Sequence, residues 1–340
     1  MIETHESEQL FDRMRVLSEM TFPDEMGMAK IYSGKVRDVF CTEKKNELIL
    51  ITTDRVSAFD RVLGTIPGKG QILNTLSSWW FSQMEDVIGN HVIAVPDPNM
   101  MVAKKLTPIP VEVVVRGALT GVTDTSLWVS YQRAEPDKDG NRHVYGLSFP
   151  LGLQKNDILP TPVITPTTKA AVGHDAPITE KEIVEKDIVA LDQWNTIRTA
   201  ALTMFTRAQS IAGQKGFILV DTKMEFGMDE NGKIYVMDEL LTPDSSRFWL
   251  AETIDERRRT GQEPDNYDKE YLRLAYKARG YGPDSSIPPQ VPKDIAQELS
   301  RRYIVLFEGL TGQKFVPPQG DIPLRIRANF GKYIYERAGR

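Results

Sequence analysis

The sequence predicts a fold that mixes helices with sheets and is divided into two domains. Its 340 residues exceed the usual size of a single domain. Short apolar runs typical of buried strands, as at 46–53, occur beside stretches with helical spacing, as at 73–84. A cluster of four prolines between residues 96 and 110 marks a candidate linker. We therefore expect an N-terminal domain over 1–108 and a C-terminal domain over 109–340.

In the N-terminal domain, the first thirty residues carry apolar side chains at helical spacing and are predicted to form one amphipathic helix. A β region follows from Tyr32 to Phe40. The apolar run at 48–51 lies within the predicted buried strand, and the helix predicted over 73–84 contains two tryptophans.

The C-terminal domain is predicted to begin with the β-branched strand 111–115, which is followed by a long proline-rich loop over 150–177. Thr179 and Glu182 have the spacing of a capping box, in which each side chain bonds the backbone of the other residue. This box is predicted to start a long helix that ends near Gly213.

Two strands, 217–225 and 233–238, are then predicted to form a hairpin. Residues 255–290 are charged and rich in glycine and proline, which predicts mainly surface loop. A last helix is predicted over 293–308, and Gly309 is predicted to end it.

Composition limits the class of protein. The net charge is −5, which argues against a general nucleic-acid binder and requires any site for anions to gather its Arg and Lys side chains locally. Cys41 is the one cysteine, so no disulfide can form within the chain. The N-terminus lacks the apolar stretch of a signal peptide and no apolar run could cross a bilayer, so we expect a cytoplasmic protein.

The predicted hairpin carries the strongest chemical signal. Because side chains alternate along a strand, Asp221, Lys223 and Glu225 share one face. The return strand ends at Asp238, close to Glu225 across the hairpin. Two or three carboxylates there would suit Mg²⁺, which prefers carboxylates and phosphate oxygens. The alternative is a solvent-exposed polar face, and the pattern alone favours neither.

The block Pro243-Asp244-Ser245-Ser246-Arg247 follows directly. Hydroxyl groups, turn N–H groups and a guanidinium together make a plausible cradle for an anion. An Asp/Ser turn that caps a short helix is the commoner explanation of such a block. Its position after the carboxylate hairpin favours a functional role.

Two further groups of polar residues precede the hairpin. Lys35 and Arg37 follow Gly34 in a loop that could lie over phosphates, although it is not a P-loop. Glu112 and Arg116 lie four residues apart on one face of a predicted strand, which indicates ligand contact or an internal ion pair.

Together, these blocks match in order a family along most of the chain. The sequence resembles the phosphoribosylaminoimidazole-succinocarboxamide synthases, which use ATP to condense aspartate with a carboxyaminoimidazole ribotide in purine biosynthesis. The matching blocks are Gly34 to Asp38, Thr53 to Asp60, Pro110 to Gly121, Thr167 to Lys169, His174-Asp175, Asp221 to Gly227, Asp238 to Trp249 and Asp268 to Arg273.

The resemblance implies an α+β enzyme with a small β-rich N-terminal lobe that covers the nucleotide and a larger, ATP-grasp-like C-terminal domain. It implies a ligase that uses ATP and Mg²⁺. Because a carboxylate is a poor electrophile, we expect the reaction to pass through an acyl phosphate. By matching position, Lys35 and Arg37 would bind the ATP phosphates and Glu112 the nucleoside. Glu225 and Asp238 would hold magnesium.

The resemblance also implies how the ribotide is held. Arg116, Arg247 and Arg273 would bind the ribotide and its phosphate or carboxylate, together with the hydroxyls of the Ser-Ser block. One position departs from the family, which usually has Ser after the glycine at 121. Here Val122 follows, so that phosphate contact must come from a backbone N–H or a neighbouring threonine.

Five residues would complete the reaction site. The resemblance implies that Lys169, His174 and Asp175 lie near the substrates, with Asp175 a candidate to orient and deprotonate the aspartate amine. Asp221 and Lys223 would position the substrate carboxylate and phosphates. Oligomeric state is not indicated by the sequence.

Three alternatives compete with this interpretation. A ligase of the same fold could act on another carboxylate or amine. A phosphotransferase of kinase type is disfavoured because the kinase H-R-D and D-F-G blocks are missing. A non-catalytic nucleotide-binding protein would have lost charged residues of the blocks, and these are present.

Overall fold

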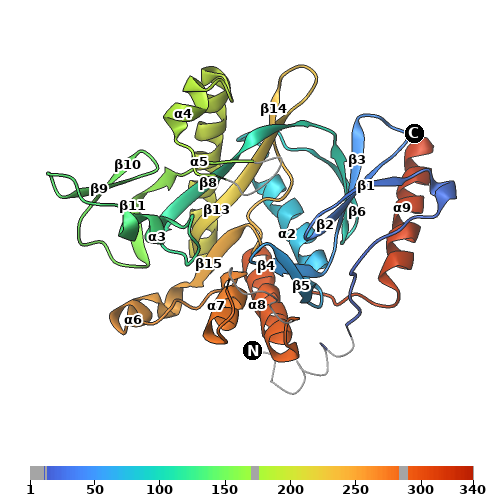
Figure 1. The fold of residues 1–340 in the computed structure, drawn as a ribbon. Helices are drawn as coiled ribbons and strands as arrows, with labels where there is room; N and C mark the ends of the chain where they lie inside the picture. Colours follow the sequence, from blue (N-terminus) through green and yellow to red (C-terminus); the bar gives the residue numbers. More distant parts are fainter. Residues whose placement is uncertain (1–10, 12–13, 170–175, 283–289, 340) are drawn as a thin grey trace.

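The computed structural model describes residue 11 and residues 14–169, 176–282 and 290–339. Two main sheets lie side by side with helices packed against them (Figure 1). This arrangement confirms the mixed helix-and-sheet class that the sequence predicts.

The first sheet is antiparallel, with the strand order β1-β2-β3-β7-β6. Its strands are β1 (Ala29–Ser33), β2 (Arg37–Cys41), β3 (Glu47–Thr52), β6 (Val92–Asp97) and β7 (Met100–Lys104). Alternate side chains of β3 and β7 point to opposite faces, and both faces are covered. Helix α2 (Lys69–Gln83) packs on one face and α9 (Ile322–Ala338) on the other (Figure 1).

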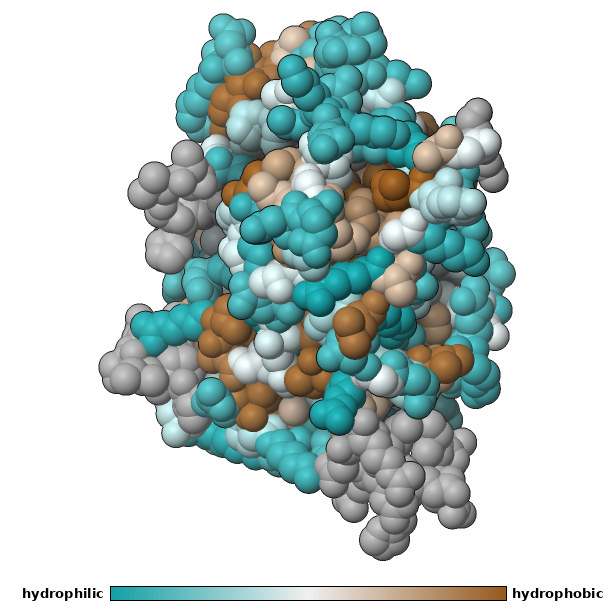
Figure 2. Space-filling view, turned by 90° about the vertical axis from the view of Figure 1, so that its right-hand side faces the viewer, coloured by the Kyte–Doolittle hydropathy of each residue, from teal (hydrophilic) through white to brown (hydrophobic). Residues whose placement is uncertain are grey.

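Helix α9 presents its other side to solvent. Leu324, Ile334 and Tyr335 are exposed there. The apolar areas visible on that side of the molecule are small and separated by polar side chains (Figure 2). Among the helices of the described residues, none has the length and apolar character needed to cross a membrane.

The second sheet has the order β11-β8-β13-β14, with β12 added beside β8 and β15 beside β13. Its strands are β8 (Thr107–Leu119), β11 (Asp157–Ile164), β12 (Thr167–Thr168), β13 (Phe217–Met228), β14 (Ile234–Met237) and β15 (Ser246–Leu250). Helix α5 (Leu191–Gln214) covers one face through Ile197, Ala201 and Phe205, which leaves the opposite face of β8 and β13 free to form a site.

The remaining helices and strands connect the sheets and pack around them. They are η1 (Asp24–Met26), β4 (Arg55–Ala58), β5 (Arg61–Thr65), α3 (Leu127–Arg133), β9 (Asn141–Val144), β10 (Leu147–Pro150), α4 (Glu180–Glu185), η2 (Ala251–Thr253), α6 (Ile254–Arg259), α7 (Glu270–Ala278) and α8 (Lys293–Thr311).

The helix predicted over the first thirty residues does not extend through them. Phe11 is helical, but residues 14–23 are not, although Met14 and Leu17 are buried. The backbone of Leu17 instead bonds Asp54: its N–H donates to the carboxylate at 2.6 Å, and its carbonyl accepts from the Asp54 N–H at 2.7 Å. The predicted β region 32–40 is a hairpin that turns at residues 34–36.

The capping box of Thr179 and Glu182 is confirmed, with both of its hydrogen bonds formed. The single long helix expected after it is divided in two, because the chain leaves the helix at Asp187, where φ is 51°. The second helix, α5, ends at Gln214, close to the predicted end near Gly213. The N–H groups of Ile188 and Val189 return to the carbonyl of Ile183, which closes α4 before α5 starts.

Two predicted loops contain regular structure. Residues 150–177 supply β11 and β12, because their extended segments complete the ladder of β8. Residues 255–290 supply most of α6 and all of α7.

The last part of the chain also differs from the prediction. Helix α8 continues through Gly309 to Thr311 and ends at Gly312, where φ is 71°. Gly309 instead allows a close approach, since a Cβ there would lie 2.7 Å from the Phe217 ring. The further helix α9 was not predicted.

The buried carboxyl group of Asp54 should make the free energy of unfolding depend on pH. Burial raises its pKa to about 6, against the lowering effect of the N–H groups of Leu17 and Gly70. The folded form therefore binds this proton more tightly than the unfolded chain. Its contribution to the free energy of unfolding is present below about pH 4 and is lost, by at most about 1.4 kcal/mol per pH unit, as the pH rises to about 6.

Asp54→Asn removes that titration. Urea unfolding at pH 4.5, 5.5 and 7 should show the wild type losing stability relative to the variant as the pH rises. A difference between the two proteins that stays constant or grows in the opposite direction would contradict the assignment.

Candidate active site

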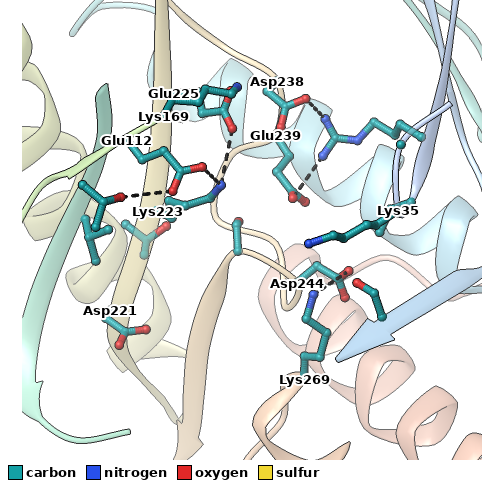
Figure 3. Close-up of a pocket in the computed structure, with 18 of the residues that line it drawn as sticks. Lys35, Glu112, Lys169, Asp221, Lys223, Glu225, Asp238, Glu239, Asp244 and Lys269 are labelled. Atoms are coloured by element: carbon teal, nitrogen blue, oxygen red, sulfur yellow. Dashed lines mark hydrogen bonds and ion pairs between the residues drawn. The ribbon is translucent and has the colours of Figure 1, made fainter. Parts of the chain in front are cut away.

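A cleft of about 600 Å³ lies between the two sheets. It is lined by the turn after β1, the free face of β8 and β13, the segment 238–247 and the start of α7. Figure 3 shows that the labelled side chains in this cleft are all charged and that lysine ammonium groups lie beside carboxylates.

The register of the second sheet places the charged residues in two rows across the strands. Glu112 of β8 lies opposite Glu225 of β13, and Arg116 lies opposite Asp221. Arg247 of β15 lies on the other side of Asp221. The shared face predicted for Asp221, Lys223 and Glu225 is thus observed, since all three line the cleft together with Glu112 and Arg116.

Lys223 lies between the two glutamates. Like charges directly opposite each other in a sheet are unfavourable, so Glu112 and Glu225 need a cation. Lys223 donates to Glu112 and lies 3.4 Å from Glu225, and Lys169 binds Glu225 from the other side (Figure 3). Burial would lower the pKa of Lys223, but Glu225 and Glu112 outweigh it and raise that pKa, so the ammonium stays charged.

The hairpin also brings Asp238 to the cleft, as the sequence predicts. Its carboxylate binds Arg37, whose guanidinium also lies 3.0 Å from Glu239 (Figure 3). Burial raises the pKa of Asp238 to about 6, although Arg37 lowers it. This ion pair joins the first sheet to the second across the cleft.

A second cationic group lies at the other end of the cleft. Arg247 is 2.5 Å from Asp221 and 3.3 Å from Glu270, while Arg116 is 3.6 Å from Asp221. Arg273 binds Glu270 at 2.7 Å. Burial would raise the pKa of Glu270, but Arg247 and Arg273 lower it to about 2. Ion pairs with two carboxylates therefore hold three guanidinium groups, all of which line the cleft.

A buried cluster supports this region and was not foreseen from the sequence. Asp244 lies 2.9 Å from Lys69 and 3.3 Å from Lys269, and Tyr303 donates to it at 2.8 Å. Lys69 and Asp244 are almost fully buried, while Lys269 and Asp244 also line the cleft. The one feature of the sequence that could have indicated this cluster was the position of Asp244 within the block Pro243 to Arg247. Nothing in the sequence around Lys69 indicates this contact.

The remaining predicted residues divide into three groups. Lys35 and Ser245 line the cleft. Ser246 does not: it is buried, and its hydroxyl bonds the Thr222 hydroxyl at 2.8 Å. His174 and Asp175 lie outside the described residues.

The departure at position 122 has a structural counterpart. Val122 is absent from the lining of the cleft, whereas Thr123, Thr125 and Ser126 contribute to it. The Thr120 hydroxyl is engaged with Asn156 at 2.6 Å, which makes Thr123 the better placed of the two neighbouring threonines.

Comparison with known proteins gives a consistent result. The model of the SAICAR synthetase family matches residues 30–286. The chain is 45% identical to the phosphoribosylaminoimidazole-succinocarboxamide synthase of Legionella pneumophila (strain Lens) over 311 residues, which cover 92% of this chain and 96% of that protein. It is 44% identical to the chloroplastic enzyme of Arabidopsis thaliana over 305 residues, covering 89% of this chain and 72% of that protein.

Solved structures agree. The SAICAR synthase from Saccharomyces cerevisiae complexed with SAICAR superposes with a TM-score of 0.72 and 30% identity, covering 88% of this chain and 99% of that chain. A type-2 SAICAR synthetase in complex with ADP gives a TM-score of 0.62 and 27% identity, covering 85% and 99%. The α+β class and the two-domain arrangement are those of these structures. The chain therefore belongs to the SAICAR synthetase family.

Proposed function

We propose that this cleft joins L-aspartate to the carboxylate of a carboxyaminoimidazole ribotide with consumption of ATP, as a step of purine biosynthesis. The observation that carries the proposal is the gathering of Arg116, Arg247, Arg273 and Lys223 in one cleft of a chain whose net charge is −5. ATP and both substrates are anionic, and preorganised cations are the groups that stabilise such charge.

The nucleotide belongs near the first sheet. The cationic side chains of Lys35 and Arg37 bind its phosphates, and Glu112 contacts its nucleoside. The S. cerevisiae relative is complexed with SAICAR and another structure with ADP, which supports the binding of both kinds of ligand by this chain. The division into a nucleotide-covering lobe, 1–108, and a substrate domain, 109–340, is part of the same proposal.

Glu225 and Asp238 are the proposed magnesium ligands. Their carboxylates face the same cleft, and Mg²⁺ is commonly bound by one or two carboxylates with substrate phosphates completing its shell. Within the described residues, no group of three or more His, Cys, Asp or Glu side chains is arranged to hold a metal ion, so the proposed site has two protein carboxylates. When bound, the ion would supply charge neutralisation at the phosphates.

The reaction proceeds in two steps. A carboxylate oxygen of the ribotide attacks the γ-phosphorus, ADP leaves, and an acyl phosphate forms. The aspartate amine then loses a proton, attacks the acyl carbon and displaces phosphate. Lys223 and Asp221 orient the reacting groups, and the arginines hold the ribotide. Asp175 is the proposed base for the amine, on the strength of the sequence alone.

Amide formation tests this proposal directly. Purified protein is assayed with ATP, Mg²⁺, the carboxyaminoimidazole ribotide and L-aspartate, and each component is omitted in turn. Product that requires all four is expected. Hydrolysis of ATP without amide would indicate another pair of substrates, and a phosphorylated product without amide would indicate a phosphotransferase.

The cellular location stays a prediction from the sequence. The Arabidopsis thaliana relative is named as chloroplastic, so members of the family are not confined to one compartment. Fractionation of the source cells would test the predicted cytoplasmic location.

A further inference from the structure

The turn that carries Lys35 and leads into Arg37 is held by one short segment. The block Thr53 to Asp60 runs under the β1–β2 hairpin and has no role in the chemistry described above. Three of its side chains reach the turn: Thr53, Arg55 and Asp60.

Arg55 makes the most contacts. Its Nη2 donates to the Gly34 carbonyl at 2.9 Å and to the Asp38 carboxylate at 2.7 Å, and its Nη1 donates to the Ser18 carbonyl at 2.6 Å. One guanidinium thereby bridges the first residue of the turn and the residue that follows Arg37. The side chain is 12% exposed, so these bonds are shielded from water.

Asp38 anchors the guanidinium of Arg55 at the base of the hairpin. Its side chain is fully buried and also accepts hydrogen bonds from the Ser33 hydroxyl at 2.8 Å and the Met20 N–H at 3.1 Å. Burial alone would raise the pKa of Asp38, but the bonds from Arg55 and Ser33 lower it. The carboxylate is therefore charged and fixed at the base of the hairpin, where Arg55 is its strongest partner.

The other two residues act on the tip of the turn. The N–H and hydroxyl of Thr53 both donate to the Val36 carbonyl, at 2.9 and 2.5 Å. Asp60 binds the ammonium of Lys35, which reaches into the cleft (Figure 3). The turn itself closes through the Gly34 N–H and the Arg37 carbonyl at 2.7 Å. Its position relative to the cleft is thus set by contacts from outside the hairpin.

We propose that Arg55 is a positioning residue for the nucleotide: it fixes the 34–36 turn in the place from which Lys35 and Arg37 reach the ATP phosphates. This inference rests on the proposed function of the cleft. Arg55 itself touches no substrate, and its effect is expected on nucleotide binding more than on the binding of aspartate or the ribotide.

The first measurement is ADP affinity by calorimetry, which does not depend on amide formation. Arg55→Ala should weaken ADP binding about tenfold, because loss of charge-assisted hydrogen bonds lets the turn move. The KM for ATP should rise by a similar factor, while the KM values for aspartate and the ribotide change less than about twofold. Arg55→Lys keeps the charge beside Asp38 but not the bridge, and it should recover part of the ADP affinity.

Arg327→Ala is the matched control. Arg327 also donates to a carbonyl of the N-terminal segment, that of Thr21 at 2.8 Å, but it does not touch the turn. ADP affinity should be unchanged in this variant. If Arg55→Ala does not fold, Thr53→Val carries the same test, since it removes the hydroxyl bond to Val36 and should weaken ADP binding about threefold.

The outcomes separate the two proposals. Folded Arg55→Ala protein that binds ADP as tightly as the wild type would overturn the role of Arg55. An equal rise in all three KM values would do the same, because it would indicate a general structural defect. Wild-type protein that binds ADP but forms no amide would contradict the proposed reaction and leave the Arg55 result intact.

Discussion

Replacement of Lys223 by alanine is expected to lower the rate of amide formation by about 10²- to 10³-fold, the usual effect of removing one preorganised charged donor from an active site. Lys223 lies between Glu112 and Glu225 on the face of the sheet that lines the cleft. Its charge can therefore be offered to a transferring phosphoryl group without reorganisation of the strand. Single-turnover amide formation at saturating substrate is the measurement.

The fold should survive this change. Lys223 is 38% exposed, and Lys169 remains to balance Glu225. Near-ultraviolet circular dichroism and the urea midpoint check this. Lys233→Ala is the matched control, because Lys233 lies beyond the end of the same strand. Its ammonium lies over the Tyr235 ring, and its backbone N–H donates to Asp229 in the hairpin turn. Lys223→Ala protein that turns over like the wild type would remove Lys223 from the reaction.

Asp244→Asn is expected to cause the largest loss of stability, about 3–5 kcal/mol, because it leaves buried ammonium groups without a counter-charge. Lys69 and Asp244 are 0% and 2% exposed, and Lys269 shares the same carboxylate. Burial would raise the pKa of Asp244, but the two lysines lower it. Its stabilising effect is therefore present above about pH 4 and lost as the pH falls below that. Urea unfolding at pH 7 measures the loss.

The control for this prediction is an ion pair in water. Asp124 and Arg133 are 79% and 65% exposed, so Asp124→Ala should change the unfolding free energy by less than about 0.5 kcal/mol. Lys69→Met combined with Asp244→Asn should recover part of the loss, because it removes the most deeply buried charge. A loss below about 1 kcal/mol in the single variant would contradict this prediction. It would show that water or another protein group stabilises the lysine ammonium groups when the charge of Asp244 is removed.

Local sequence patterns predicted those parts of the fold that local forces determine. The capping box at Thr179, the buried strand at 47–52 and the β13–β14 hairpin follow from side-chain spacing and turn chemistry, and all three are present. Elements stabilised by distant partners were missed. The segment around Leu17 has helical spacing but bonds Asp54 thirty-seven residues away, which no local rule detects.

The candidate site shows the same division. Alternation along a strand was enough to place Asp221, Lys223 and Glu225 on one face. It could not show that Arg116 lies opposite Asp221, since that register depends on pairing between strands more than a hundred residues apart. Lys69 was missed for the same reason. Nor could the pattern show that Ser246 is buried, with its hydroxyl bonded to that of Thr222.

The position of α9 has a consequence for biosynthesis of the chain. Ile322, Ile326 and Phe330 complete a core with residues of the first sheet, and Arg325 binds Asp97 and Asn99 at the β6–β7 turn. The ribosome makes the strands of that sheet more than two hundred residues before it makes this helix. One apolar side of the sheet therefore stays uncovered through most of translation. The first sheet can therefore reach its final packing only after the second sheet and α9 have been synthesised.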